Sequence, residues 1–179
     1  MAVFGTEGAD NMAAGQNGIS LNGDGKVDVT LAPNPVNLVV NLLGGDDYFN
    51  GRGQFGAGLH YLGPITLDGG AGNDRLLRGS SGNDRISGGD GTDDLQGQEG
   101  DDVLDGGPGN DTIAGSAGND TITGGPGADS MNGSYGNDVF YAHDGEADTL
   151  ISGGPGIDTA YYDAGLDPAP LAIEHKFPS

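Results

Sequence analysis

The sequence contains no cysteine and only 6 lysine and arginine residues, against 27 aspartate and glutamate residues. The absence of cysteine excludes a disulfide framework and a thiolate metal site. The formal net charge of −21 makes nucleic acid and anionic membranes poor partners, and a compact fold with this charge repels itself unless cations are bound. No apolar run approaches the roughly 18 residues that cross a bilayer, and the first ten residues do not resemble a signal peptide. We therefore expect a soluble chain, or one already trimmed.

Sequence motifs of several enzyme classes are also absent. The three histidines, His60, His143 and His175, are isolated, and there is neither an H-E-x-x-H nor a G-x-S-x-G sequence. Residues 51–56 match the dinucleotide-binding fingerprint as a string, but no βαβ pattern surrounds them. Paired aspartates could serve a glycosidase, but the aspartates of this chain belong to a repeat and few aromatic residues could form a sugar platform. We expect no enzymatic activity.

Glycine is abundant, with 38 residues, and it recurs with a strict period. Eight nine-residue units run from residue 69 to residue 141, with one extra residue, Arg78, between the first and the second. They read GGAGNDRLL, GSSGNDRIS, GGDGTDDLQ, GQEGDDVLD, GGPGNDTIA, GSAGNDTIT, GGPGADSMN and GSYGNDVFY. The period indicates a repeat architecture rather than the low-complexity chain that so much glycine and proline would otherwise suggest.

Each unit predicts a loop followed by a short strand. Glycines at positions 1 and 4, and often 2, mark sites of positive φ or close backbone approach. Asparagine is frequent at position 5, and we expect it to adopt the left-handed conformation there. Positions 7 to 9 predict a strand whose middle residue points inward while its neighbours point outward. The inward residues are Leu76, Ile86, Leu95, Leu104, Ile113, Ile122, Met131 and Phe140.

Two units make one coil of about 18 residues, and coils stacked at roughly 4.8 Å form two parallel sheets face to face. Position 2 supports this longer period, because it is glycine in the odd units and serine or glutamine in the even ones. The stack therefore has two distinguishable sides.

The coils alone are poorly stabilised. Burying one leucine or isoleucine contributes about 1.5–3 kcal/mol, whereas ordering nine residues of backbone costs roughly 9–18 kcal/mol. Stacking also places the position 6 carboxylates of units two apart about one strand spacing from each other. At an effective dielectric constant near 20, two such charges repel by about 3.5 kcal/mol. A divalent cation between them would reverse the sign of this interaction.

The units resemble the RTX (repeats-in-toxin), or hemolysin-type, calcium-binding family. The resemblance implies an all-β, right-handed parallel β-roll, a β-helical solenoid with about six or more Ca²⁺ ions between its loops. It implies carboxylate ligands at Asp74, Asp93, Asp111 and Asp129 on one side of the stack and at Asp84, Asp102, Asp120 and Asp138 on the other. It implies carbonyl ligands at loop glycines, for which we name Gly70, Gly72, Gly82, Gly89, Gly91, Gly100, Gly107, Gly109, Gly118, Gly125, Gly127 and Gly136. The alternative is that Gly-Asn-Asp is turn chemistry without metal, which eight units in register and the acidic surplus disfavour.

The pattern weakens toward both ends of the chain. We interpret residues 1–68 as irregular coils of the same solenoid or an N-terminal cap, with further ligands at Asp10 and Asp47. A separate small β domain is the competing view. The calcium-binding β-roll then spans residues 69–161, including two looser units that end near Asp148 and Asp158. Residues 162–179 are a cap for the last coil or, alternatively, a secretion signal.

Together these features predict a secreted or cell-surface calcium-binding module that folds on binding metal and has a scaffolding or adhesive role. Calcium ions are its expected partners, with no nucleic acid and no membrane insertion. End-to-end self-association into a filament or surface layer is the alternative, as is the repeat portion of a larger toxin or enzyme. Ice binding by outward threonines is a minor alternative, because the outward positions are chemically irregular.

Overall fold

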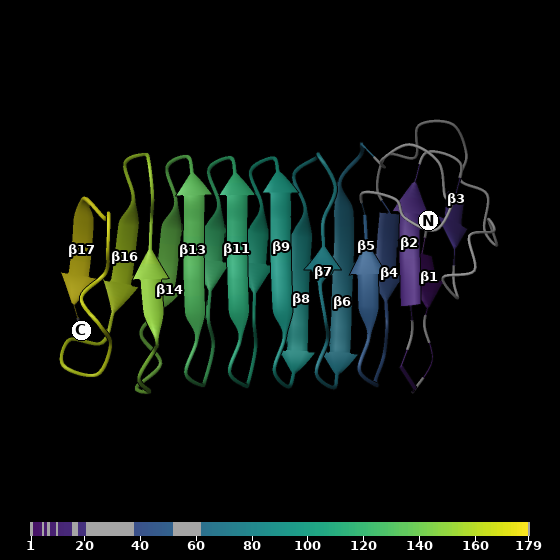
Figure 1. The fold of residues 1–179 in the computed structure, drawn as a ribbon, viewed down its shortest axis with the longest axis horizontal. Coiled ribbons are helices and arrows are strands. Elements are labelled where there is room, and N and C mark those ends of the chain that lie inside the picture. Colours follow the sequence, from purple (N-terminus) through teal and green to yellow (C-terminus); the bar gives the residue numbers. More distant parts are fainter. Residues whose placement is uncertain are drawn as a thin grey trace.

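The computed structural model of the chain describes residues 2–4, 6, 8–9, 11–15, 18–20, 38–51 and 62–178. These residues form short strands that stack into an elongated solenoid of two facing sheets, with the loops in two rows along its edges (Figure 1). The described residues include no helix that is long and apolar enough to span a membrane. The predicted all-β parallel solenoid is confirmed.

In the part of the chain that the structure describes, sheet one has nine strands, and every neighbouring pair in it is parallel. In spatial order they are β1 (Ala2–Phe4), β4 (Leu38–Asn41), β6 (Ile65–Ala71), β8 (Arg85–Asp90), β10 (Val103–Asp105), β12 (Thr121–Thr123), β14 (Val139–Ala142), β16 (Thr159–Tyr162) and β17 (His175–Pro178). The order follows the chain direction, so each coil adds its strand beside the previous one.

Sheet two has eight strands among the described residues. In spatial order they are β15 (Leu150–Ser152), β13 (Ser130–Tyr135), β11 (Thr112–Ala117), β9 (Asp94–Glu99), β7 (Leu77–Arg78), β5 (Tyr48–Asn50), β2 (Asn11–Gly15) and β3 (Gly18–Ser20). Among the described strands of this sheet, only the β2–β3 pair is antiparallel. The described strands before the repeats thus belong to the same two sheets as the repeats.

The register confirms the 18-residue coil. Ile86 pairs with Leu104, Leu104 with Ile122 and Ile122 with Phe140, each 18 residues further along the chain. The interior between the sheets contains one buried apolar side chain from each repeat strand. Positions 1 and 6 of the repeat, a glycine and an aspartate, are also buried. Because the strand alternation leaves the remaining positions outside, the core is a narrow double row of aliphatic and aromatic side chains.

The first repeat unit departs from the predicted register. Leu77 is fully buried and pairs with Leu95, whereas Leu76 is only partly buried and has a φ of 58°. The prediction of Leu76 as the inward residue was therefore wrong. The extra residue lies before Leu77 rather than at Arg78, and Leu76 absorbs it in a left-handed conformation that restores the strand alternation.

The C-terminal strand β17 is the edge strand of sheet one. Its Phe177 ring stacks on Tyr161, which stacks on Tyr141, with centroid separations of 5.0 and 5.3 Å. Ile173, just before β17, is buried against the last coil. Residues 162–178 therefore contact the last coil through β17 and Ile173; their role as a cap, or as a secretion signal, stays a prediction.

Candidate metal sites

The position 6 aspartates form two rows, one along each edge of the stack. In each row, the Oδ1 of one aspartate accepts a hydrogen bond from the backbone N–H of the equivalent residue in the preceding coil. The first ladder contains Asp47, Asp74, Asp93, Asp111, Asp129, Asp148 and Asp167, with N–H to Oδ1 distances of 2.8–3.1 Å. The second ladder contains Asp84, Asp102, Asp120, Asp138 and Asp158, with distances of 2.7–2.9 Å. Aspartates far apart in sequence thus lie one coil apart in space.

The second carboxylate oxygens of the ladders are buried without a hydrogen-bond partner. This holds for the Oδ2 atoms of Asp74, Asp93, Asp102, Asp111, Asp120, Asp129, Asp138, Asp148 and Asp158. A buried carboxylate oxygen without a partner costs free energy, and one such oxygen in nearly every rung is a regular feature rather than a local defect. These oxygens are acceptors that the protein itself leaves unused.

Glycine at position 1 makes room for these carboxylates. A Cβ added at Gly115 would overlap the Oδ2 of Asp120, and the same overlap recurs at Gly97 with Asp102. Neither glycine has a positive φ, so close approach rather than backbone conformation excludes a side chain here. Glycines at positions 2 and 4, except Gly82, do have positive φ, for example 106° at Gly89 and 142° at Gly91.

Burial raises the pKa of every repeat aspartate in the ladders. It raises the pKa of Asp102 to about 8, against an ordinary value of 3.8; the N–H of Asp84 opposes the shift and the charges of Asp84 and Asp120 add to it. It likewise raises the pKa to about 7 at Asp111, Asp120 and Asp148, and to about 6 at Asp74, Asp84, Asp129 and Asp138. Desolvation disfavours the ionised carboxylates, so the metal-free ladders resist carrying their full negative charge.

A protein-family model for the RTX calcium-binding nonapeptide repeat, in four copies, matches residues 66–79, 76–104, 105–140, 114–150 and 123–160. Together these matches span residues 66–160, more than half of the 179 residues. The chain belongs to the RTX calcium-binding nonapeptide repeat family. No curated protein and no solved structure matches it in the corresponding comparisons.

The donor set of the RTX repeats fits calcium. The unused ligands are carboxylate oxygens, and the carbonyls at positions 2 and 4 lie close to the following coil, since a Cβ added at Gly109 would overlap Gly91 O. No three aspartate, glutamate or histidine side chains gather at one point among the described residues, so a site would combine carboxylates with carbonyls. Oxygen ligands from adaptable loops suit Ca²⁺ better than Mg²⁺, which demands a tighter octahedral shell.

Position 5 of the RTX repeats has a different role from the predicted one. No asparagine in the described part of the chain has a positive φ, so the expected left-handed conformation was wrong. Instead, the side-chain oxygen at position 5 accepts the N–H of position 5 in the following coil, at 2.9 Å from Asn137 N to Asn119 Oδ1 and 3.1 Å from Asp101 N to Asn83 Oδ1. These outward hydrogen bonds tie successive coils together beside the carboxylates.

The structure places the other predicted ligands as follows. Asp148 and Asp158 continue the two ladders beyond the eight repeat units. Asp47 directly precedes Asp74 in the first ladder, at a sequence separation of 27 residues, where later rungs are 18 or 19 residues apart. Asp10 lies outside the described residues. The glycines named as carbonyl ligands lie in the loops, except Gly70 and Gly89, which lie near the ends of β6 and β8. Their role as ligands stays a prediction.

Two carboxylates that the motif does not reveal extend the ladders at the C-terminal end. Asp167 Oδ1 accepts the N–H of Asp148 at 3.1 Å, and Glu174 Oε2 accepts the N–H of Asp158 at 2.8 Å. Neither follows a Gly-x-x-Gly-x sequence. Their spacing of 19 and 16 residues from the preceding rung was the only signal in the sequence.

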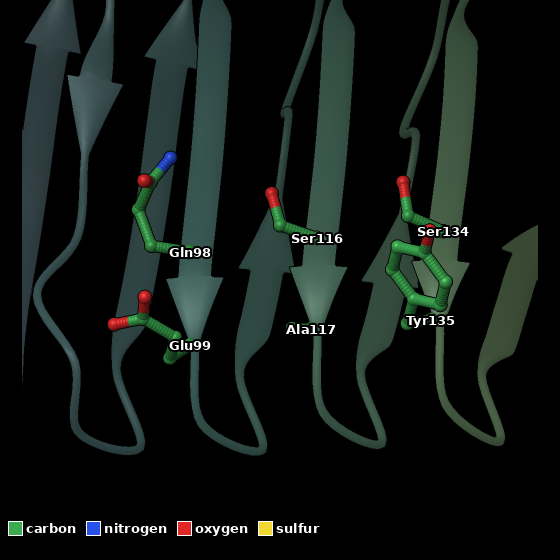
Figure 2. Close-up of a pocket in the computed structure, with 6 residues that line it drawn as sticks. All are labelled: Gln98, Glu99, Ser116, Ala117, Ser134 and Tyr135. Carbon is green, nitrogen blue, oxygen red and sulfur yellow. The ribbon is translucent and has the colours of Figure 1, made fainter.

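A shallow groove of about 320 Å³ crosses the outer face of sheet two near the loops (Figure 2). It is lined by positions 2 and 3 of three even units, namely Gln98, Glu99, Ser116, Ala117, Ser134 and Tyr135. Gln98, Ser116 and Ser134 have φ of 90°, 88° and 76°, the conformation that glycine adopts at position 2 in the odd units. The small Ala117 pairs with Glu99 on one side and with Tyr135 on the other.

Proposed function

We propose that this chain is a secreted calcium-binding β-roll module whose middle coils fold on binding several Ca²⁺ ions, with a scaffolding or adhesive role and no catalytic activity. The observation that carries the proposal is the row of buried, unpartnered Oδ2 atoms along both edges of the stack. RTX repeats occur typically in secreted proteins, which supports the extracellular assignment.

The ladders couple folding to metal through their own repulsion. In a medium poor in free calcium, the carboxylates of one ladder come within one coil of each other only at a cost in desolvation and charge repulsion. Calcium ions bound between the coils would supply the positive charge that offsets both costs. Because the unfolded chain does not assemble the ligands, the free energy of binding becomes free energy of folding.

The direct test is a far-UV circular dichroism titration of the EDTA-treated chain with Ca²⁺ and, separately, with Mg²⁺. We expect a steep transition to β structure with calcium and a much weaker response to magnesium. A chain that is already rich in β structure after EDTA treatment and indifferent to calcium would overturn the proposal.

A pair of variants makes this titration specific to the ladder. Asp120→Asn removes a buried rung, whereas Asp105→Asn removes an exposed aspartate of β10 on the same stack. We expect Asp120→Asn to raise the midpoint calcium concentration about tenfold or more, equivalent to about 1.4 kcal/mol, and Asp105→Asn to leave it nearly unchanged. Equal shifts in both variants would mean that overall charge, not the ladder, controls folding.

The C-terminal edge of sheet one argues against the filament alternative. In the β17 register, Lys176 occupies the column that Phe140 and Ala160 fill in the coils before it. Pro178 has no N–H to offer a further strand. A charge in a core column and an edge proline are features that block edge-to-edge pairing. We therefore favour a monomeric module; a sedimenting species that grows with protein concentration in calcium would reverse this choice.

A further inference from the structure

Asp84, the first carboxylate of the second ladder, differs from the rungs that follow it. Its Oδ2 accepts the backbone N–H of Ser80 at 2.5 Å, and the Ser80 hydroxyl lies 3.0 and 3.1 Å from its two oxygens. Its Oδ1 accepts the N–H of Ile65 at 2.7 Å. Both oxygens of Asp84 are thus used by the protein, whereas Asp102, Asp120 and Asp138 leave their Oδ2 without a partner.

The backbone of the loop before Asp84 explains this contact. At position 2, Gln98, Ser116 and Ser134 have positive φ, but Ser80 does not, and at position 4 Gly82 also lacks the positive φ of Gly100. In a regular coil the position 2 N–H donates along the stack to the next coil, as Gly107 N does to Gly124 O. In the loop of residues 79–83 the N–H of Ser80 instead turns inward to the carboxylate. Ser80 is fully buried.

The preceding coil shows why a metal would be poorly held at this rung. Each ladder carboxylate accepts a hydrogen bond from the coil before it, at the position of the preceding aspartate of the ladder. At Asp84 that place is taken by Ile65, and one coil earlier by Leu38, both buried. An ion between these coils would lie beside an apolar side chain, and the Oδ2 of Asp84 is already hydrogen-bonded to the N–H of Ser80.

We propose that Ser80 replaces a calcium ion at the first rung of the second ladder, so that Asp84 is satisfied by protein groups and metal binding in this row begins at Asp102. This inference rests on the proposed calcium function and assigns Asp84, which the repeat motif predicts as a ligand, a metal-free role. Ser80 and Asp84 then join the apolar N-terminal coils to the metal-dependent coils.

The opposite end of the first ladder has a related arrangement. Asp167, its last carboxylate, accepts the backbone N–H of Asp163 at its Oδ2, at 2.6 Å and also four residues back in the chain. Each ladder thus has one end at which a local N–H takes the second carboxylate oxygen. The Oδ2 atoms without a partner belong to the rungs from Asp74 to Asp148 in the first ladder and from Asp102 to Asp158 in the second.

The test is a crystal of the full chain grown in saturating calcium, with an anomalous difference map recorded at a wavelength where calcium scatters anomalously. We expect calcium peaks at ligand distance, about 2.3–2.6 Å, from the Oδ2 of Asp102, Asp120 and Asp138, and none at the Oδ2 of Asp84. A peak at Asp84 of similar height to that at Asp120 would overturn this inference while leaving the calcium function intact. No peak at any rung would overturn the calcium function itself.

Counting bound ions by native mass spectrometry provides a second readout. We expect Asp84→Asn to retain the calcium count of the unchanged protein and Asp120→Asn to lose at least one ion. A loss of the same size in both variants would contradict the metal-free role of Ser80. If Asp84→Asn does not fold, the anomalous map of the unchanged chain still decides.

Discussion

The first described coils and the middle coils share one backbone plan but fill their interiors differently. In β4 and the residue that follows it, Leu38, Val40 and Leu42 occupy the three inward columns, and all three are fully buried. In β8 and the loop before it, the same three columns contain Asp84, Ile86 and Gly88. The middle coils thus exchange two buried apolar side chains for a carboxylate and a glycine. Since each buried aliphatic side chain contributes about 1.5–3 kcal/mol, the middle coils need another source of stability.

Calcium removal should separate the two regions most strongly. At 100 times its dissociation constant, a ligand stabilises the fold by about 2.7 kcal/mol per site. We therefore expect EDTA to lower hydrogen-exchange protection about 100-fold or more in β8 to β14, and much less in β4 and β6. Hydrogen exchange followed by mass spectrometry measures both regions in one sample. Equal loss of protection in β4 and β10 would show that the solenoid unfolds as one unit.

Acid should partly replace calcium in the middle coils. The pKa values of Asp102 and Asp120 rise to about 8 and 7 in the fold from the ordinary 3.8, so the metal-free folded chain binds more protons than the unfolded chain between these values. This contribution to stability is complete below about pH 4 and is lost as the pH rises through about 7 to 8. We expect the EDTA-treated chain to show more β structure by circular dichroism at pH 5 than at pH 8. More β structure at pH 8 would contradict the raised pKa values.

A single methyl group at position 1 should damage a middle coil. In Gly115→Ala the new Cβ would overlap the Asp120 carboxylate, and we expect a loss of about 3 kcal/mol, at the upper end of overpacking effects. Gly8→Ala is the control, because its Cβ would meet nothing nearer than the Thr6 hydroxyl at 3.9 Å. Urea unfolding in excess calcium measures both. A loss below about 0.5 kcal/mol in Gly115→Ala would mean that the carboxylate has room to move.

The smallest effect is expected at position 5. Asn119→Ala removes the acceptor of the Asn137 N–H, and one such hydrogen bond contributes about 1 kcal/mol. The exposed Thr112→Ala on β11 should change the free energy of unfolding by less than about 0.5 kcal/mol. The same urea experiment in calcium compares them. Equal effects would show that the outward hydrogen bonds do not contribute to coil stacking.

Several details of the candidate sites could be predicted because they follow from period alone. The sequence repeat predicts the 18-residue coil and the two rows of aspartates. It also predicts the inward residues Ile86, Leu104 and Ile122. Leu76 and Leu77 could not be separated, because adjacent leucines fit the pattern equally well until the pairing with Leu95 is known. The role of asparagine at position 5 was misjudged because its partner is the N–H of a residue 18 positions away.

The sequence by itself determined the solenoid, its period and the acidic character of its edges, because each depends on residues that recur locally with fixed spacing. Only the tertiary structure decided which rungs differ. Ser80 turns its N–H to Asp84, and Ile65 replaces a carboxylate in the coil before it. Asp167 and Glu174 continue the ladders without the motif. These contacts join residues of neighbouring coils through loop conformations, and the spacing of a single repeat carries no information about the coil that will lie against it.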